Sequence, residues 1–280
     1  MTTTTAPTRV IQGGWRQAIS DGLVVMWRNL KRIPRIPELA IFAVIQSIMF
    51  VLLFAFVFGG AIPLPGYIGV PNAYREYLMP GIFVQTIAFA SATTAIGMTD
   101  DMAKGIIDRF RSLPMARSAV LTGRSFADAI YQTGILCVLM VSGLLVGWSV
   151  NNGAVDFLIG VVLLIVFAFT MSWVGIWLGL SVPTVEVGQQ VAFVVIFPIT
   201  FVSSAFVPIQ TMPTLLQPFA EWNPVSTLTS SLRILWGNPN PFATNNLPST
   251  EPILVTIGWV VVLLALFVPL GVRKYRSTSR

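Results

Sequence analysis

The sequence of 280 residues is 55% hydrophobic and only 10% charged, with a mean hydropathy of +0.78. Soluble domains carry about 25% charged residues, so this composition excludes an ordinary soluble domain and favours a membrane protein. The absence of histidine and the single cysteine, Cys137, exclude a disulfide framework and argue against a zinc or haem site. The net charge of +6 does not indicate nucleic-acid binding, because the basic residues lie at the ends of apolar segments.

The N-terminal segment, residues 1–38, is predicted to contain an amphipathic helix. Apolar side chains recur there every three or four residues, at Trp15, Ile19, Leu23, Met26 and Leu30, while Arg16 and Arg28 lie off this stripe. The pattern is typical of a helix that lies in the headgroup region of a membrane. The basic residues have a second explanation, because the orientation of the first membrane span alone would also select them.

Six apolar segments are long enough to cross the hydrocarbon core as helices, which takes about 20 residues. They are residues 39–58, 78–99, 129–148, 157–182, 187–207 and 253–272. The first of them is too late and too long for a cleaved signal peptide. The expected fold is therefore an all-α polytopic membrane protein, with six transmembrane helices in a domain of residues 39–272.

The insert between the second and third segments, DDMAKGIIDRFRSLPMAR at residues 100–117, is the most charged stretch of the chain. Its residues divide between two helical faces, an apolar face with Met102, Ile106, Phe110 and Leu113 and a charged face with Lys104, Asp108 and Arg111. We predict a short amphipathic helix at about residues 101–114, ended by Pro114. An inert turn would be shorter, so the apolar face predicts docking on the membrane surface or on another protein.

Residues 203–237, after the fifth apolar segment, are predicted not to cross the membrane. The stretch contains Pro208, Pro213, Pro218 and Pro224, together with Glu221 and Arg233. These residues prevent a regular helix exposed to lipid. We expect short helical pieces that enter the membrane and return.

The positions of the basic residues test this topology independently. Of 17 Lys and Arg residues, six precede the first apolar segment, five lie at residues 104–124 and four lie at residues 273–280. Basic segments of membrane proteins tend to be cytoplasmic, which requires an even number of spans between each pair of them. Six spans, both termini in the cytoplasm and a cytoplasmic tail of residues 273–280 satisfy this requirement if residues 203–237 do not cross.

One part of the chain resembles a known family. The stretch YLMPGIFVQTIAFASATTAIGMTDDMAKGIIDRFRSLPMARSAVLTGRSFADA, residues 77–129, together with the six-span pattern and the late proline-rich segment, resembles the transmembrane subunit of an ABC type-2 exporter, and most of all the daunorubicin-resistance-like permeases. Its most diagnostic part is an acidic-Arg-x-Arg-x-x-Pro pattern that runs from Asp108 to Pro114. Many relatives carry Glu at the position of Asp108, a difference that keeps the charge.

The resemblance implies roles for several segments. It implies that residues 101–114 form a coupling helix in a groove of an ATPase subunit, that the N-terminal helix lies at the inner membrane surface, and that residues 203–237 form a re-entrant outer hairpin. The residues expected to couple to the ATPase are Lys104, Gly105, Asp108, Arg109, Phe110, Arg111 and Pro114. The residues expected to form a gate at the outer hairpin are Pro198, Phe206, Pro208 and Pro213.

The resemblance also implies the partners. The expected assembly is a pair of permeases, identical or paralogous, with two copies of a separate ATP-binding subunit. No glycine of the sequence is followed by lysine, so the phosphate-binding loop Gly-x4-Gly-Lys-Ser/Thr is impossible in this chain. We therefore expect the chain not to be an enzyme by itself and to carry no cofactor or metal, while the partner ATPase binds ATP and Mg.

The apolar segments contain a possible cargo cavity. The residues expected to line it are Phe50, Phe54, Gln85, Phe89, Phe193 and Phe197. Such walls, with few hydrogen-bonding groups, suit a lipophilic or amphiphilic cargo such as a drug-like molecule, an antibiotic or a lipid. A phenylalanine in a membrane span also often faces lipid or a neighbouring helix, so each of these assignments has a structural alternative.

Two other functional classes fit the sequence less well. An ion-coupled secondary transporter or a channel is the main alternative, although such carriers usually place charged residues within their spans, and here charged residues occur only near the ends of the spans. A sodium carrier that uses backbone carbonyls would be compatible with this pattern. An intramembrane enzyme is disfavoured, because no span contains paired carboxylates or a nucleophile with a base.

Overall fold

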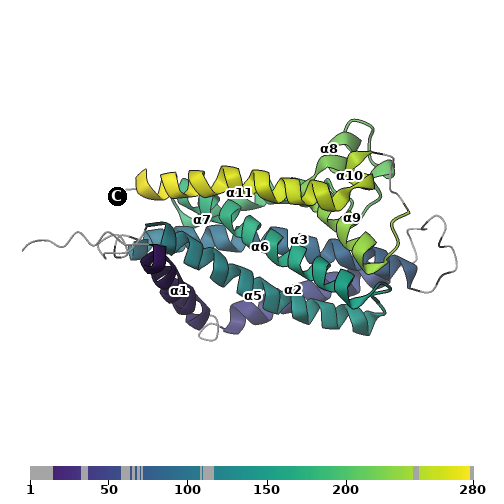
Figure 1. Cartoon of the computed structure of the whole chain (residues 1–280), viewed down its shortest axis with the longest axis horizontal. Coiled ribbons are helices and arrows are strands. Elements are labelled where there is room, and N and C mark those ends of the chain that lie inside the picture. Colours follow the sequence, from purple (N-terminus) through teal and green to yellow (C-terminus); the bar gives the residue numbers. More distant parts are fainter. Residues whose placement is uncertain are drawn as a thin grey trace, which may run out of the picture.

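The computed structural model describes residues 15–32, 37–57, 64, 67, 70, 72–107, 109, 117–241 and 246–277. Every regular element within these residues is helical, as the sequence predicts (Figure 1). The elements are α1 (Trp15–Arg32), α2 (Pro37–Leu52), η2 (Leu53–Val57), α3 (Ala73–Ala103), α5 (Arg117–Val146), α6 (Ala154–Ser181), α7 (Val185–Phe201), η3 (Ile209–Thr211), α8 (Gln217–Trp222), α9 (Pro224–Trp236), α10 (Leu247–Thr250) and α11 (Pro252–Ser277).

Within the described residues, four helices, α3, α5, α6 and α11, are long and apolar enough to cross a membrane. Two further apolar helices are shorter. One is α2, which continues into the π-helical turn η2, and the other is α7, with 17 residues. The chain is therefore an all-α protein with helices suited to a membrane, and a total of six crossing helices stays a prediction.

Two of the long helices extend beyond the apolar segments. Helix α3 continues to Ala103 instead of ending at residue 99, and α5 begins at Arg117 instead of residue 129. The added turns carry charged residues that composition assigns to a loop. The structure places two of them, Asp101 and Arg124, between α3 and α5, where they form an ion pair.

The end of α3 corrects the predicted start of the amphipathic insert. Residues 101–103 form the last turn of α3, and the helix breaks at Lys104 and Gly105. Gly105 has φ +65°, a left-handed conformation that favours glycine. The helical path resumes at residues 106 and 107, whereas Asp108 and residues 110–116 lie outside the described residues.

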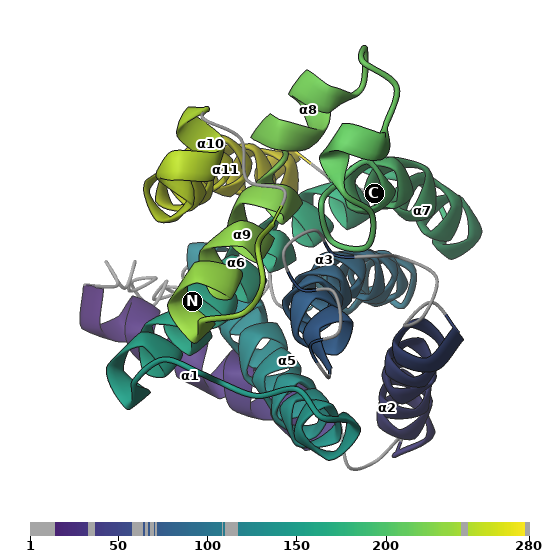
Figure 2. The same cartoon turned by 90° about the vertical axis from the view of Figure 1, so that its right-hand side faces the viewer.

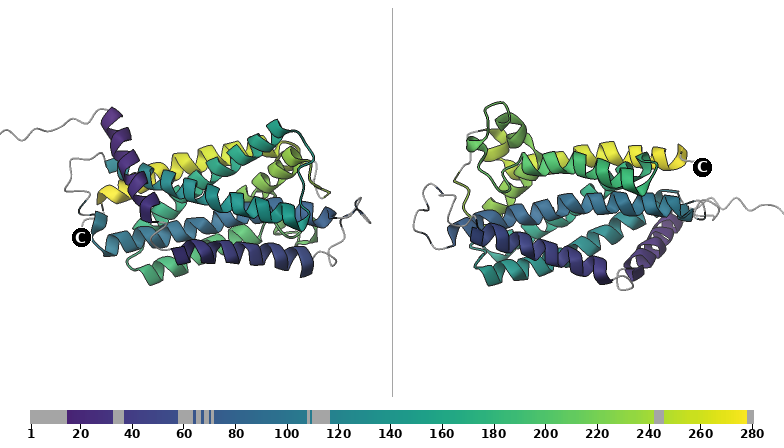
Figure 3. Two further views of the ribbon diagram at one scale, coloured as in Figure 1. Left: turned by 90° about the horizontal axis from the view of Figure 1, so that it is seen from below. Right: turned by 180° about the vertical axis from the view of Figure 1, so that it is seen from behind.

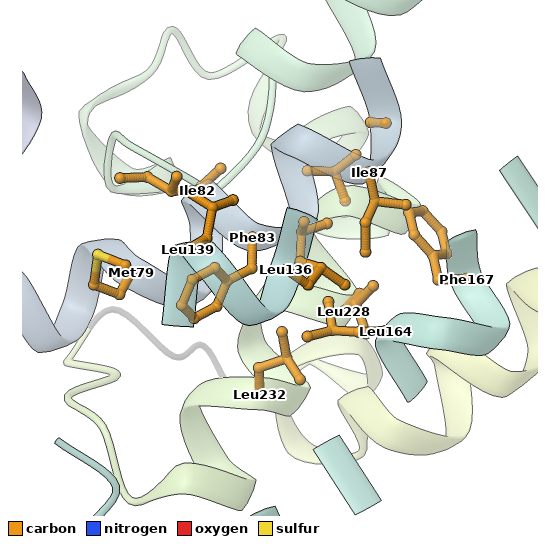
Figure 4. Packing of buried hydrophobic residues seen from close by; sticks show 14 of the residues in the cluster. Met79, Ile82, Phe83, Ile87, Leu136, Leu139, Leu164, Phe167, Leu228 and Leu232 are labelled. Atoms are coloured by element: carbon orange, nitrogen blue, oxygen red, sulfur yellow. The ribbon is translucent and has the colours of Figure 1, made fainter. Parts of the chain in front are cut away.

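Helix α3 occupies the centre of the bundle and packs against α5, α6, α7 and α9 (Figure 2). Figure 4 shows the apolar core around it, which includes Met79, Ile82, Phe83 and Ile87 of α3, Leu136 and Leu139 of α5, Leu164 and Phe167 of α6, and Leu228 and Leu232 of α9. A β-carbon at Gly175 of α6 would lie 2.3 Å from the carbonyl oxygen of Ser91. One at Gly179 would lie 2.4 Å from that of Ala95, so these glycines permit backbone contact between α6 and α3.

The bundle has two distinct ends. The basic end carries α1, the last turns of α3 and α11, and the first turn of α5, and α1 runs obliquely to the long helices there (Figure 3). The apolar residues that join these elements form a separate core cluster, which includes Val25, Met98, Leu121, Trp173 and Tyr275. The opposite end, called the hairpin end, carries the N-terminus of α3, the α5–α6 connection and residues 203–241 (Figure 1).

Helix α1 forms as the sequence predicts, but a different side chain anchors it. Val25, which lies off the predicted stripe, is 2% exposed in the cluster at the basic end. Gly22 lies next to the backbone of Gly123 in α5. Ile19 and Leu23 of the stripe are instead more than half exposed, at 55% and 54%. Helix α1 therefore packs closely along α5 and keeps an uncovered apolar face.

Residues 203–237 form the short helical pieces η3, α8 and α9, as the proline pattern predicts. Both ends of this segment lie at the hairpin end. Tyr77 and Arg233 both bond the Ser204 carbonyl, and the Trp236 indole nitrogen donates to the carbonyl of Phe157, 3.3 Å away. Helix α9 packs between α3, α6 and α11. The depth of the segment in the membrane stays a prediction.

Candidate functional site

A cavity of about 470 Å³ opens between α2, α3, α5 and α7. Figure 2 shows α2 and α7 on either side of α3. Its lining residues are Phe42, Gln46, Ser47, Phe50, Gln85, Thr86, Phe89, Ala90, Thr93, Tyr131, Gln132, Ile135, Phe193, Phe197 and Phe201. None of these described lining residues is charged. The structure thus brings together five of the six residues expected at a cargo cavity.

Aromatic side chains from four helices form the walls of this cavity. Phe89 of α3 and Phe193 of α7 have ring centroids 6.1 Å apart, and Phe197 stacks on Phe201 at 4.2 Å. The Phe197 side chain is 50% exposed and Phe42 of α2 is 69% exposed. The cavity is therefore open along the face between α2 and α7.

Amide side chains provide most of the polarity of the cavity. Gln46, Gln85 and Gln132 come from α2, α3 and α5, respectively. Gln85 is only 4% exposed, and its buried Nε2 has no hydrogen-bond partner among the described residues. A buried amide without a hydrogen-bond partner costs free energy. A bound molecule that accepts a hydrogen bond from Gln85 would remove this cost, which would favour its binding.

Phe54, the sixth expected cavity residue, does not line the cavity. Its ring stacks on Phe206 with centroids 4.5 Å apart, and Phe206 in turn lies 6.0 Å from Phe201. The expected gate residues are dispersed as well. Pro198 lies in the last turns of α7, and Pro208 is buried just before η3, whereas Pro213 is exposed. Among the described residues expected at the gate, only Phe206 contacts the aromatic residues near the cavity.

The structure describes three of the seven expected coupling residues, and these three lie at the basic end. Lys104 is exposed and pairs with Asp100 at 2.7 Å, one turn earlier in the chain. Gly105 sits at the break after α3, and Arg109 is exposed. Asp108, Phe110, Arg111 and Pro114 lie outside the described residues.

An ionic cluster near the basic end, partly shielded from solvent between α3 and α5, was not predicted from the sequence. Arg124 of α5 forms a very short ion pair with Asp101 of α3 and lies 3.8 Å from Asp128 of its own helix. Thr94 donates a hydrogen bond of 2.9 Å to Asp128. The spacing of Arg124 and Asp128 by one helical turn was an available signal.

A second buried arginine, Arg233 of α9, is 1% exposed at the hairpin end. Its Nε donates to the Tyr77 carbonyl at 2.9 Å, and its Nη2 donates to the Ser204 carbonyl at 3.0 Å. The guanidinium also lies 3.7 Å from the centroid of the Tyr77 ring. The sequence shows that this charge must avoid lipid, but it does not show these partners.

Comparison with known proteins agrees with this geometry. The sequence matches the ABC-2 type transporter family over residues 22–236. It is 30% identical over 262 residues, 94% of this chain and 88% of the relative, to the daunorubicin resistance ABC transporter permease protein DrrB1 of Streptomyces coeruleorubidus. It is 24% identical over 283 residues, 98% of this chain and 96% of the relative, to the probable doxorubicin resistance ABC transporter permease protein DrrC of Mycobacterium tuberculosis. A putative transport permease, ycf38 of Cyanophora paradoxa, is 25% identical over 264 residues, 92% of this chain and 89% of the relative.

The described residues form an all-helical bundle with apolar helices long enough to span a membrane and a cavity without charged lining residues, which is the architecture of a membrane-embedded transport protein. The chain belongs to the ABC-2 type transporter family. It is the transmembrane subunit of an ABC exporter, and membership of this family implies association with an ABC ATPase subunit.

Proposed function

We propose that this permease exports lipophilic or amphiphilic compounds that carry aromatic rings and a hydrogen-bond acceptor. The observation that carries the proposal is the cavity of about 470 Å³, with phenylalanine walls, amide side chains and no charge among its described lining residues. Drug-sized ligands are held in largely apolar cavities of this order by a few placed polar groups. Two relatives are named for resistance to daunorubicin and doxorubicin, which supports a drug-like cargo.

The polar anchor for such a cargo is Gln85. Its amide is buried and lacks a partner in the described part of the chain, and it lies one helical turn before Phe89 on α3. A carbonyl or hydroxyl oxygen of the cargo would accept its N–H, while the cargo rings contact Phe89 and Phe193. An ion-coupled carrier is disfavoured, because the buried charges of α3 and α5 lie outside the cavity lining.

The proposed topology has six spans with both termini in the cytoplasm. At 1.5 Å per residue, the 17 residues of α7 give about 26 Å, close to the hydrocarbon thickness of about 30 Å. The exposed apolar face of α1, with Ile19, Leu23 and Trp27, suits an interfacial helix at the inner surface of the cell membrane. Residues 203–237 then enter the outer leaflet and return, with Phe206 as the gate residue nearest the cavity.

The proposed energy source is a separate ATPase that binds ATP and Mg and docks on residues 104–114. Two ATPase copies and a second permease, identical or paralogous, complete the assembly, and the second permease would cover the open side of the cavity between α2 and α7. In this arrangement Phe110 fills a groove of the ATPase, and Asp108, Arg109 and Arg111 orient the docking.

The central experiment measures ATP-driven daunorubicin movement in vesicles that contain the permease and its ATPase. Gln85→Leu should lower transport at least fivefold and leave assembly intact, and Phe193→Ala should act in the same direction. Leu145→Ala is the matched control, because Leu145 is 84% exposed on α5 and does not line the cavity. Normal transport by Gln85→Leu would contradict the proposed hydrogen bond between Gln85 and the cargo. The absence of daunorubicin transport by the unaltered complex would contradict the proposed class of cargo.

A second experiment tests the docking segment. Phe110→Ala should leave membrane insertion intact, reduce ATPase co-purification and abolish transport, and Arg111→Ala should have a milder effect. ATP hydrolysis by the permease alone would contradict a separate ATPase.

A third experiment tests the topology. Cysteine labels at Asn152 and Asn240 should react from outside intact cells, and labels at Ser112 and Ser277 should not. External labelling of Ser112 would show that the topology is inverted.

A further inference from the structure

The ionic cluster of Asp101, Arg124 and Asp128 joins the two helices that flank the docking segment. The Asp101 and Arg124 side chains are 6% and 12% exposed, respectively. Asp101 lies in the last turn of α3, and Arg124 lies two turns into α5. Residues 104–116 connect the two helices, so Asp101 lies about one turn before this connection and Arg124 lies two turns into the helix that follows it. A displacement of the connection would therefore be passed along α3 and α5 towards this pair.

Arg124 lies between two carboxylates and hydrogen-bonds to only one of them. Its Nη1 donates to Asp101, while its buried Nε has no hydrogen-bond partner in the described part of the chain. That Nε is 3.8 Å from Asp128 Oδ2, which Thr94 of α3 holds through a hydrogen bond of 2.9 Å. A small shift of α3 along α5 would let Arg124 bond to Asp128 instead of Asp101.

The surroundings leave room for the arginine. A β-carbon at Gly97 of α3 would lie 2.4 Å from Arg124 Nη2, so the side chain occupies space that only glycine leaves. A narrow crevice beside it is lined by Val25, Arg28 and Asn29 of α1 together with Asp101 and Arg124. The cluster therefore also lies against the N-terminal helix.

The same two helices carry the cavity. Thr93, adjacent to Thr94, lines it from α3, and Gln132, one turn after Asp128, lines it from α5. The cluster thus lies between the docking segment and the cavity along both helices. A relative movement of α3 and α5 at the cluster would move Gln85 and Phe89 with respect to Gln132.

We propose that Arg124 is a positioning residue that couples the docked ATPase to the cavity by exchanging between Asp101 and Asp128. With Asp101 it ties the end of α3 to α5, and with Asp128 it releases α3 while its charge stays paired. In either arrangement the arginine keeps a carboxylate partner, which limits the cost of the exchange. The coupling role rests on the proposed ATPase docking, whereas the movement of α3 is tested without cargo.

Asp128→Asn separates the exchange from a static brace. The substitution keeps the shape of the side chain, its contact with Thr94 and the Arg124–Asp101 pair, but it removes the second carboxylate. The exchange predicts normal assembly and ATP hydrolysis with at least a tenfold lower ratio of daunorubicin moved to ATP hydrolysed. A static brace predicts an unchanged ratio. Arg124→Gln should lower the ratio similarly, and Arg124→Lys should restore part of it because the charge is kept.

Spin labels report the movement independently of cargo. Cysteines at the exposed Ala103 and Ser118, in a Cys137→Ser background, place one label on each helix beside the cluster. Trapping the complex with ATP and vanadate should shift the label-to-label distance in the otherwise unaltered chain and not in Asp128→Asn. Equal shifts in both, or a transport ratio in Asp128→Asn within twofold of normal, would overturn the proposal. A distance shift without daunorubicin transport would count against the proposed cargo alone.

Discussion

The two ends of the bundle each bury an arginine, and they satisfy its charge with different partners. At the basic end, Arg124 lies between the carboxylates of Asp101 and Asp128. At the hairpin end, Arg233 donates to the carbonyls of Tyr77 and Ser204 and lies against the Tyr77 ring. Carboxylates on two helices offer alternative positions for one cation, whereas backbone carbonyls at two fixed positions hold it in a single place.

This difference assigns different mechanical roles to the ends. Arg233 links α9 to α3 and to the turn after α7, so it fixes the hairpin as a brace. An aromatic cluster reinforces that end, in which the Phe83 ring lies 5.2 Å from Trp148 and 5.8 Å from Trp236. The basic end has the smaller apolar cluster and an ion pair that can be exchanged, so motion is expected to start there.

The largest expected effect on stability comes from removing the brace. Arg233→Met deletes two hydrogen bonds from a charged donor, each contributing about 1.5–3 kcal/mol, and leaves two buried carbonyls without that partner. The free energy of unfolding should fall by about 3 kcal/mol or more, as measured by unfolding of the purified protein in detergent. Arg233→Lys keeps the charge but lacks the planar guanidinium, so its free energy of unfolding should lie between those of Arg233→Met and the unaltered protein. Equal stability of all three proteins would remove the distinction between the ends.

The next effect concerns the contact that joins the ends. Gly175→Ala would place a methyl group 2.3 Å from the Ser91 carbonyl oxygen, so α6 and α3 must separate. Overpacking of this kind costs about 1–3 kcal/mol. Gly134→Ala is the matched control, because a β-carbon at Gly134 meets no atom within 4 Å and should be neutral or slightly stabilising. Similar stabilities of the two variants would show that the helices are not in backbone contact.

Much of the helical fold was predictable from sequence, because each apolar segment must form a helix to satisfy its backbone in lipid. The cavity was partly predictable for the same reason, since glutamine and phenylalanine stand out in apolar helices. Phe54 escaped prediction because its neighbour, Phe206, is distant in sequence. The long-range partners of Arg124 and Arg233 were equally hidden. Asp101 is 23 residues from Arg124, and backbone carbonyls have no sequence signature at all.

A smaller effect is expected within the hairpin end. The Trp148 indole nitrogen donates to Asn238 Oδ1 at 3.0 Å, and Asn238 Nδ2 donates to the Ser149 carbonyl at 2.8 Å. Asn238→Ala removes both bonds, so we expect a loss of about 1–2 kcal/mol in the free energy of unfolding. Hydrogen exchange should rise in the α5–α6 connection and stay unchanged at the basic end. Faster exchange around Arg124 would show that the two ends unfold as one unit.

The smallest effect is expected at the exposed ion pair next to the proposed switch. Asp100 and Lys104 lie 2.7 Å apart on the last turn of α3, but the Lys104 side chain is 59% exposed. Exposed pairs of this spacing contribute about 0.3–0.5 kcal/mol, because water screens the charges and ordering the side chains costs entropy. Lys104→Gln should therefore leave the free energy of unfolding nearly unchanged, in the same measurement in which Arg233→Met loses about 3 kcal/mol or more. A loss as large as that of Arg233→Met would show that the exposed charges of this segment stabilise the basic end as strongly as the buried arginine stabilises the hairpin end, and the difference between the two ends would disappear.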